Sequence, residues 1–221
     1  LVDCMMNLPL LYWAYEETKD PRFKQIATMH ADTAQKYFVR ADGSVNHNVE
    51  FNPETGEFVR TYGGQGYAVG SSWTRVQAWA VYGIILSYIH TQNEEYLNTA
   101  KRIANYFIAN IPADGLITVD FRQPKEPYRY DDTAAAIAAC GLLAISEAVS
   151  EPEQDSYHQP ALKMLKALYE NHCDCSKDSD CFLQKCTAAY HDEKHEFPII
   201  YGDYYFMEAI FKLTGAGVYL W

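Results

Sequence analysis

The stretch TKDPRF at residues 18–23 has a counterpart further along the chain, TQNEEY at residues 91–96. The two are 73 residues apart (91 − 18), and the Asp-Gly pairs at 42–43 and 114–115 repeat at a spacing of 72 (114 − 42). Each stretch is followed at helical spacing by two alanines: Ala27 and Ala31, then Ala100 and Ala104. Similarity at a fixed spacing indicates a repeated structural unit. The sequence therefore predicts repeated helical hairpins, arranged as a solenoid or a closed ring.

Apolar periodicity between turn signals predicts seven helices in the chain. Their expected ranges are 1–18, 21 to about 41, 73–91, 94–111, 132–150, 152–171 and 200–214. Pro9 is expected to kink or break the first of them. Short extended pieces are expected in the connecting loops, at 45–51 and 116–121. The repeat is about twice the ~34 residues of a tetratricopeptide hairpin, and the connections are long. Both features favour a toroid with loops gathered at one end.

The composition limits the classes of function. The chain has 221 residues, of which 48% are hydrophobic, enough for a single domain over residues 1–221. Its 18 basic and 29 acidic residues give a net charge of −11, which argues against nucleic acid or an anionic membrane as a partner. No apolar run is long enough to span a membrane. The chain begins with Leu1 and not with methionine, so we expect a truncated or processed polypeptide.

A glycine-rich loop runs into an aromatic helix at residues 63–80, GGQGYAVGSSWTRVQAWA. Glycine permits backbone angles that bring a chain close to a ligand, and Ser71 or Ser72 is placed to cap the helix that follows. Arg75 and Trp79 are four residues apart (79 − 75), so a flat cation and a flat ring share one helical face. This pairing suits a ring-shaped substrate with a carboxylate, while core packing of the tryptophans is the alternative.

The six cysteines are unevenly distributed. Cys4 and Cys140 stand in apolar helical surroundings, which is typical of small buried thiols. The other four crowd into one polar segment, 172–197, whose C-x-C-x5-C-x4-C spacing lacks the C-x-x-C knuckles of a strong zinc motif. The spacing favours two disulfides over free thiols, and both over a structural zinc ion. These four are Cys173, Cys175, Cys181 and Cys186.

Five segments, spread in order over nearly the whole chain, carry a family resemblance. They are VDCMMNLPLLYWA (2–14), IATMHADTAQKYFVRADGSVNH (26–47), GQGYAVGSSWTRVQAWAVYG (64–83), DDTAAAIAACGLLAIS (131–146) and IIYGDYYFMEAI (199–210). Together they resemble glycoside hydrolase family 88, the unsaturated glucuronyl hydrolases and their rhamnogalacturonyl relatives. Segment 172–197 does not fit, and we expect it to be a lineage-specific Cys-rich loop insertion.

The resemblance implies an all-α (α/α)6 barrel, a toroid of six helical hairpins. It also implies a substrate: oligosaccharides left by polysaccharide lyases, which end in a uronate with a C4=C5 double bond. A carboxylic acid would protonate C4, water would add at C5, and the resulting hemiketal would release the next sugar. This chemistry implies no metal and no organic cofactor.

The resemblance also assigns roles to residues of this chain. Asp3 would be the general acid and base, and burial among the apolar residues of the first helix would favour its protonated form. His47 and Gln65 would position water or hydroxyls near the double bond, and Arg75 would hold the uronate carboxylate. The aromatic members of the implied substrate site are two sugar platforms and a cleft tyrosine: Trp73, Trp79 and Tyr190.

The chain departs from the family pattern in one respect. Seven helices are recognisable where the ring needs twelve, so we expect the C-terminal part of such an enzyme, inactive or nearly so by itself and with exposed apolar faces.

Two expectations do not depend on the missing helices. Asp131 and Asp132 are expected to act as a helix N-cap. The alternative functions are an unsaturated rhamnogalacturonyl hydrolase, a carbohydrate-binding module without catalysis, and a helical-repeat interaction protein.

Overall fold

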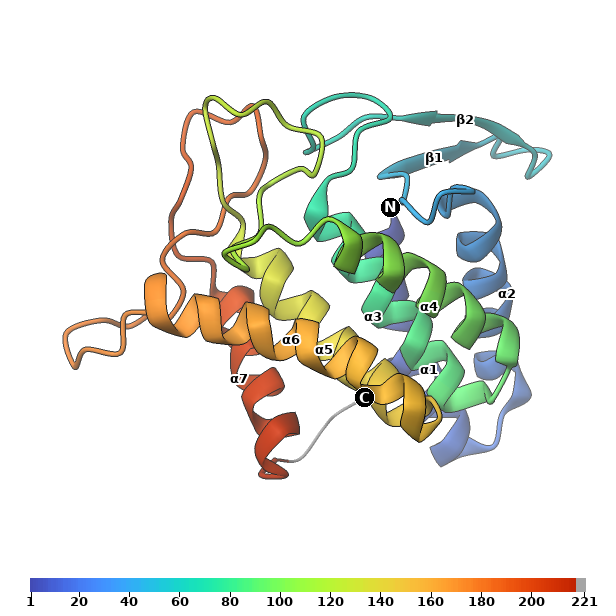
Figure 1. Cartoon of the computed structure of the whole chain (residues 1–221). Helices are drawn as coiled ribbons and strands as arrows, with labels where there is room; N and C mark the ends of the chain where they lie inside the picture. The colour runs from blue at the N-terminus through green and yellow to red at the C-terminus, as the bar shows by residue number, and fades with distance from the viewer. Residues whose placement is uncertain (218–221) are drawn as a thin grey trace.

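The computed structural model describes residues 1–217, and all seven predicted helices are present (Figure 1). Pro9 lies at the start of α1, where a 3-10 helix gives way to the α-helix, so the predicted break is confirmed. The helical elements are η1 (Val2–Asn7), α1 (Leu8–Thr18), α2 (Pro21–Phe38), α3 (Thr74–Thr91), α4 (Glu94–Ala109), α5 (Asp132–Ala148), α6 (Glu151–Asn171) and α7 (Ile200–Thr214). Within this range no helix is both long and apolar enough to cross a membrane.

The predicted repeat is visible in the backbone of the first two hairpin turns. Lys19 ends α1 with a φ of 60°, and Gln92 ends α3 with a φ of 56°. The next residues, Asp20 and Asn93, cap α2 and α4, and each side chain accepts a hydrogen bond from the N–H group two residues later. Gly43 and Gly115 also match, with φ values of 85° and 82°. The same backbone turns and caps therefore recur 72–73 residues apart, which confirms the repeated helical hairpin.

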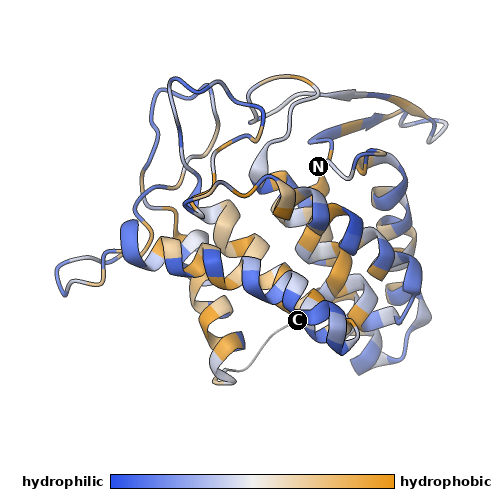
Figure 2. Ribbon diagram, in the orientation of Figure 1, coloured by the Kyte–Doolittle hydropathy of each residue, from blue (hydrophilic) through white to orange (hydrophobic). Residues whose placement is uncertain are grey.

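The helices form an inner row and an outer row. The inner row runs η1–α1, α3, α5, α7, and each of α1, α3 and α5 packs against the outer helix that follows it. Helices α3 and α5 are buried on nearly all sides, which explains their continuous apolar composition. Figure 2 shows hydrophobic residues concentrated along α5 and α7 and mixed with hydrophilic residues along α4 and α6.

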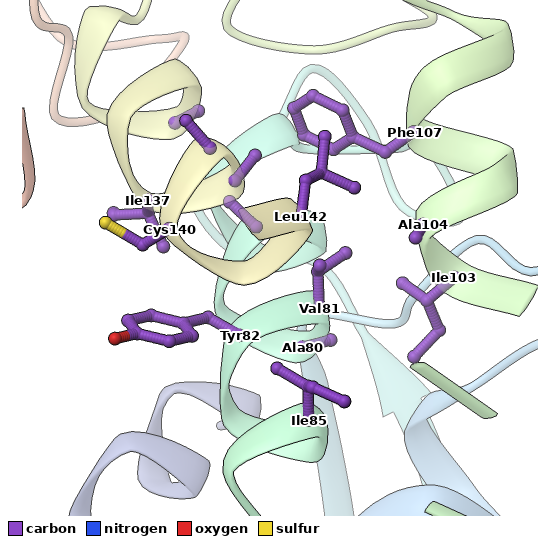
Figure 3. Packing of buried hydrophobic residues seen from close by; sticks show 14 of the residues in the cluster. Ala80, Val81, Tyr82, Ile85, Ile103, Ala104, Phe107, Ile137, Cys140 and Leu142 are labelled. Atoms are coloured by element: carbon purple, nitrogen blue, oxygen red, sulfur yellow. The ribbon is translucent and has the colours of Figure 1, made fainter. Parts of the chain in front are cut away.

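Helix α3 packs against both α4 and α5 in the core. Val81 and Ile85 of α3 extend toward Ile103 of α4, whereas Tyr82 extends toward Cys140 of α5 (Figure 3). All five of these side chains are inaccessible to solvent. This packing fixes the position of α3, whose first turn leads to the glycine-rich loop.

The connecting loops depart from the predicted extended pieces. Strand β1 covers Asn48–Phe51, shorter than predicted, and pairs antiparallel with β2, Phe58–Tyr62. Strand β2 was not predicted, because all five of its residues are exposed and they show no alternation of buried and exposed positions. The predicted piece 116–121 forms only isolated bridges. The β-hairpin and the long loops lie together at one end of the helices (Figure 1).

Candidate functional site

Asp120 fixes the glycine-rich loop above the start of α3. Its buried carboxylate accepts hydrogen bonds from the backbone N–H groups of Tyr67 (3.0 Å) and Ser72 (3.0 Å), and from the hydroxyl of Ser71 (2.5 Å). The prediction that Ser71 or Ser72 caps α3 was wrong, because the position before Thr74 is Trp73 and it makes no side-chain cap. Both serines bind Asp120 instead, which makes the loop rigid where it approaches the site.

His47 is held as one tautomer by this loop. The backbone N–H of Gln65 donates to His47 Nδ1 over 3.1 Å, so the proton of the neutral ring resides on Nε2. A Cβ atom on Gly64 would lie 2.0 Å from that Nδ1, so only glycine permits this approach. Burial lowers the pKa of His47, although the nearby Asp3 carboxylate opposes the effect. At neutral pH, His47 is therefore an uncharged donor through Nε2.

Three polar atoms near His47 are buried and have no hydrogen-bond partner within residues 1–217. They are Nε2 of His47, Nε1 of Trp73 and Oδ1 of Asp3. The rings of His47 and Trp73 lie 4.5 Å apart, centroid to centroid, and the Asp3 carboxylate is close enough to act on His47 electrostatically. Buried polar groups are normally paired. The two N–H groups of His47 and Trp73, with the Asp3 oxygen nearby, are therefore available to bind a polar ligand or water.

Arg75 lies next to Trp73, and its charge is already paired with that of Asp131. Its Nε and Nη2 atoms donate to the two carboxylate oxygens of Asp131 over 3.0 and 2.8 Å, Nη2 also donates to the carbonyl oxygen of Thr187, and Nη1 donates to the hydroxyl of Tyr201 over 2.6 Å. Burial lowers the pKa of Arg75, but the charge and hydrogen bonds of Asp131 outweigh burial and raise it.

This geometry does not support the expected role of Arg75. The Arg75 side chain is 2% exposed, and four of its five N–H groups are used, so it has no free fork for a uronate carboxylate. Asp131 does not cap α5 with its side chain, which corrects the N-cap prediction. Asp132 binds Nδ1 of His172 (2.7 Å) and the N–H of Lys185 (2.9 Å).

Trp79 and Tyr190 are the remaining predicted site residues, and each lies next to a residue of this region. The ring of Trp79 is half-buried and lies 6.2 Å from the ring of Tyr201. Tyr190 is largely buried, and its backbone N–H donates to the carbonyl oxygen of Gln65 over 2.8 Å. The Gln65 side chain donates in turn to the carbonyl oxygen of Ala188. Six of the seven residues singled out in the sequence are thus linked by hydrogen bonds or ring contacts, directly or through Tyr201. Asp3 acts on His47 electrostatically, and the binding roles of all seven stay predictions.

The cysteines of segment 172–197 do not form the expected disulfides, since all six cysteines of the chain are free. Burial raises the pKa of Cys173 and of Cys186 to about 12, so both are protonated at neutral pH and poorly reactive. Cys175, by contrast, is exposed. Within residues 1–217, no three His, Cys, Asp or Glu side chains are grouped to hold a metal. That the segment is a lineage-specific insertion stays a prediction.

Comparison with known proteins identifies the family. The model of glycosyl hydrolase family 88 matches residues 2–221. The chain belongs to this family. It is 39% identical over 220 residues to the unsaturated glucuronyl hydrolase of Bacillus sp. (strain GL1), covering 96% of this chain and 58% of that protein. It is 33% identical over 218 residues to the unsaturated chondroitin disaccharide hydrolase of Streptococcus pneumoniae, covering 96% of this chain and 55% of that protein.

Solved structures of the family share the fold. The crystal structure of unsaturated glucuronyl hydrolase from Bacillus sp. GL1 matches with a TM-score of 0.95 and 36% identity, covering 100% of this chain and 60% of that one. A Streptococcus agalactiae enzyme, complexed with dGlcA-GalNAc6S, matches with a TM-score of 0.90 and 31% identity, again covering 100% and 60%. The predicted all-α (α/α)6 fold class is therefore confirmed. The chain spans less than two thirds of each of these proteins.

Proposed function

We propose that the protein hydrates the C4=C5 double bond of an unsaturated uronate at the non-reducing end of lyase-generated oligosaccharides. The buried atoms of Asp3, His47 and Trp73 that lack hydrogen-bond partners support this proposal most directly. They combine one carboxyl group with two N–H donors. Family membership supports the proposal, because two relatives are named for unsaturated glucuronyl and chondroitin disaccharide hydrolysis.

The proposed chemistry uses Asp3 twice. In its protonated form Asp3 donates its proton to C4 of the substrate, and the resulting carboxylate then accepts a proton from the water that adds at C5. The product is a hemiketal, which opens and releases the next sugar. His47 donates through Nε2 to a hydroxyl or to the water, and Gln65 lies beside it because the Gln65 backbone holds the His47 ring. Trp79, which is half-buried, provides a flat surface for a sugar ring. The ring of Trp73 is only 3% exposed, so it is expected to contribute its unpaired Nε1–H and not a stacking face.

A second candidate is the unsaturated rhamnogalacturonyl hydrolase reaction, which uses the same double bond with a different neighbouring sugar. The first candidate is favoured because the relatives that match most of this chain are named for glucuronyl and chondroitin substrates. A binding module without catalysis would need the same aromatic surfaces and Tyr190, but it would not depend on the carboxyl group of Asp3.

The test follows the loss of ultraviolet absorbance of the conjugated double bond. Unsaturated chondroitin and rhamnogalacturonan disaccharides are offered to this chain and to the longest natural polypeptide that contains it. Turnover that disappears in Asp3→Asn and persists in Asp178→Asn, an exposed aspartate of the Cys-rich loop, supports the function and the role of Asp3. Turnover that survives Asp3→Asn refutes that role, and absence of turnover in both folded polypeptides refutes the function.

A further inference from the structure

Tyr201 is the outward-facing neighbour of the buried Arg75. It is the second residue of α7, directly after the Cys-rich loop, and 36% of its surface is exposed. Its hydroxyl oxygen accepts a hydrogen bond from Arg75 Nη1 over 2.6 Å, and the guanidinium carbon lies 5.6 Å from the centre of its ring. The hydroxyl of Tyr201 is therefore an accessible polar group in direct contact with the buried guanidinium of Arg75.

The hydrogen bond from Arg75 decides which way the tyrosine proton points. A phenol that accepts from a guanidinium keeps its own O–H for a different acceptor, because it has one hydrogen to give. No hydrogen bond of the described residues uses that hydrogen. Burial raises the pKa of Tyr201, and Arg75 only partly opposes this, so the hydroxyl stays protonated at neutral pH. Tyr201 thus presents an unused O–H donor backed by a cation.

The surroundings of Tyr201 belong to the candidate site. Its ring lies 6.2 Å from that of Trp79, and the Asp3 carboxylate acts on its titration. Arg75 cannot reach a ligand with a paired fork of its own, because Asp131 occupies Nε and Nη2. An acidic sugar resting on Trp79 and within reach of Asp3 would meet the Tyr201 hydroxyl before it met the guanidinium.

We propose that Tyr201 is a specificity-determining residue that donates its hydroxyl proton in a hydrogen bond to the carboxylate of the terminal uronate. The proposal rests on the proposed function. In this arrangement Arg75 is a positioning residue: it orients the hydroxyl and contributes its charge through Tyr201. Asp131 in turn holds Arg75 in place.

The test compares Tyr201→Phe with wild type, both in the longest natural polypeptide that contains this chain, on an unsaturated chondroitin disaccharide and on its uronate methyl ester. Phenylalanine keeps the ring against Trp79 and removes only the hydroxyl. Because a hydrogen bond to a charged group is at stake, we expect kcat/KM for the acid to fall by about 10- to 100-fold and that for the ester by less than about 3-fold. The matched control is Tyr169→Phe, an exposed tyrosine on the outer helix α6, which should leave both values unchanged.

Three other outcomes would contradict the role of Tyr201 or the proposed function. Equal losses on acid and ester, or no loss on the acid, would overturn the role of Tyr201 while leaving the proposed function intact. A wild-type enzyme that does not distinguish acid from ester would overturn it as well, whether or not the variant folds. Absence of both turnover and tryptophan-fluorescence quenching in wild type with the disaccharide would instead refute the proposed function, and this proposal with it.

Discussion

Arg75 and Asp131 form a buried ion pair, with 2% and 0% of their side chains exposed. Removing one partner of such a pair leaves a charge without compensation in a low-dielectric interior. We therefore expect Asp131→Asn to lower the free energy of unfolding by about 3–5 kcal/mol, measured by urea denaturation. Glu54→Gln, which removes an exposed carboxylate in the β-hairpin turn, is the control and should change stability by less than about 0.5 kcal/mol.

The same pair allows a sharper version of that experiment. Replacing both partners, as Arg75→Met with Asp131→Leu, removes the desolvated charges together, so the double variant should recover a large part of the stability lost in Asp131→Asn. A loss below about 1 kcal/mol in the single variant would contradict the view that this pair is fully desolvated.

His47 predicts a pH dependence of stability. Burial lowers its pKa in the folded state below the ordinary value of about 6.5, so the unfolded chain takes up a proton first as the pH falls. Its contribution to stability is therefore present above about pH 6.5 and is lost as the pH falls toward the folded pKa. Most carboxylates stay ionised above about pH 5, which leaves histidines to dominate this window.

The check is a series of thermal unfolding curves between pH 7 and pH 5. Wild type should lose stability over this range, and His47→Gln should lose less of it. His158→Gln, on the outer helix α6, serves as the comparison. A slope that is identical in wild type and His47→Gln would show that His47 does not carry the effect.

At the residue level the sequence indicated which residues lie near one another, while their roles in binding and catalysis stay predictions. Asp3, His47, Gln65 and Trp73 were grouped through segments that resemble a family, and the structure does bring them together. The pairing of Arg75 with Asp131 spans 56 positions and leaves no periodic or local signal. For the same reason Tyr201 could not be singled out, since its contact with Arg75 spans 126 positions.

At the level of elements, the repeated hairpin turns can be tested through their caps. The side chains of Asp20 and Asn93 each accept a hydrogen bond from a backbone N–H group that the helix leaves unpaired. Asp20→Ala and Asn93→Ala should each cost about 1 kcal/mol of stability. Their effects should add in the double variant, since the capping bonds lie in separate turns and share no partner. Ser150 occupies the same position before α6 without a side-chain cap bond, so Ser150→Ala should cost clearly less.

These caps also explain why the helices could be predicted. A capping residue and an apolar period are local properties, so the sequence indicated the start of α2 and α4 correctly and the end of α7 at Thr214. Segment 172–197 has no such signals. Its shape depends on distant partners, such as the bond from the Leu183 N–H to Asp203 of α7 and the pairing of His172 with Asp132. Its cysteine spacing therefore suggested disulfides that the structure does not contain.

On the scale of the whole molecule, the inner row of helices has two exposed ends within residues 1–217. Leu10 and Trp13 of α1 are 64% and 52% exposed, and Ile200 and Phe211 of α7 are 75% and 41% exposed. Large apolar side chains that face solvent favour association. We expect this chain to self-associate with rising concentration in sedimentation velocity, and Trp13→Gln with Phe211→Gln to weaken the association.

The control for association is Tyr169→Gln, which removes an apolar ring that is 64% exposed on an outer helix and not at an end of the row. It should leave the sedimentation profile unchanged. If wild type sediments as a monomer at all concentrations, the exposed apolar residues of α1 and α7 do not drive self-association.

The three hydrogen-bond partners of Arg75 are made at different times during synthesis, which fixes when its buried pocket can form. Its partners are Asp131, Thr187 and Tyr201, and the last of these is made 126 residues after Arg75. At roughly 5–20 residues per second, a ribosome needs about 6–25 seconds to cover that length. The first hairpins pack mainly on their sequence neighbours and have that interval to form. Until Tyr201 has been made, the pocket around the guanidinium lacks one of its three partners and stays incomplete.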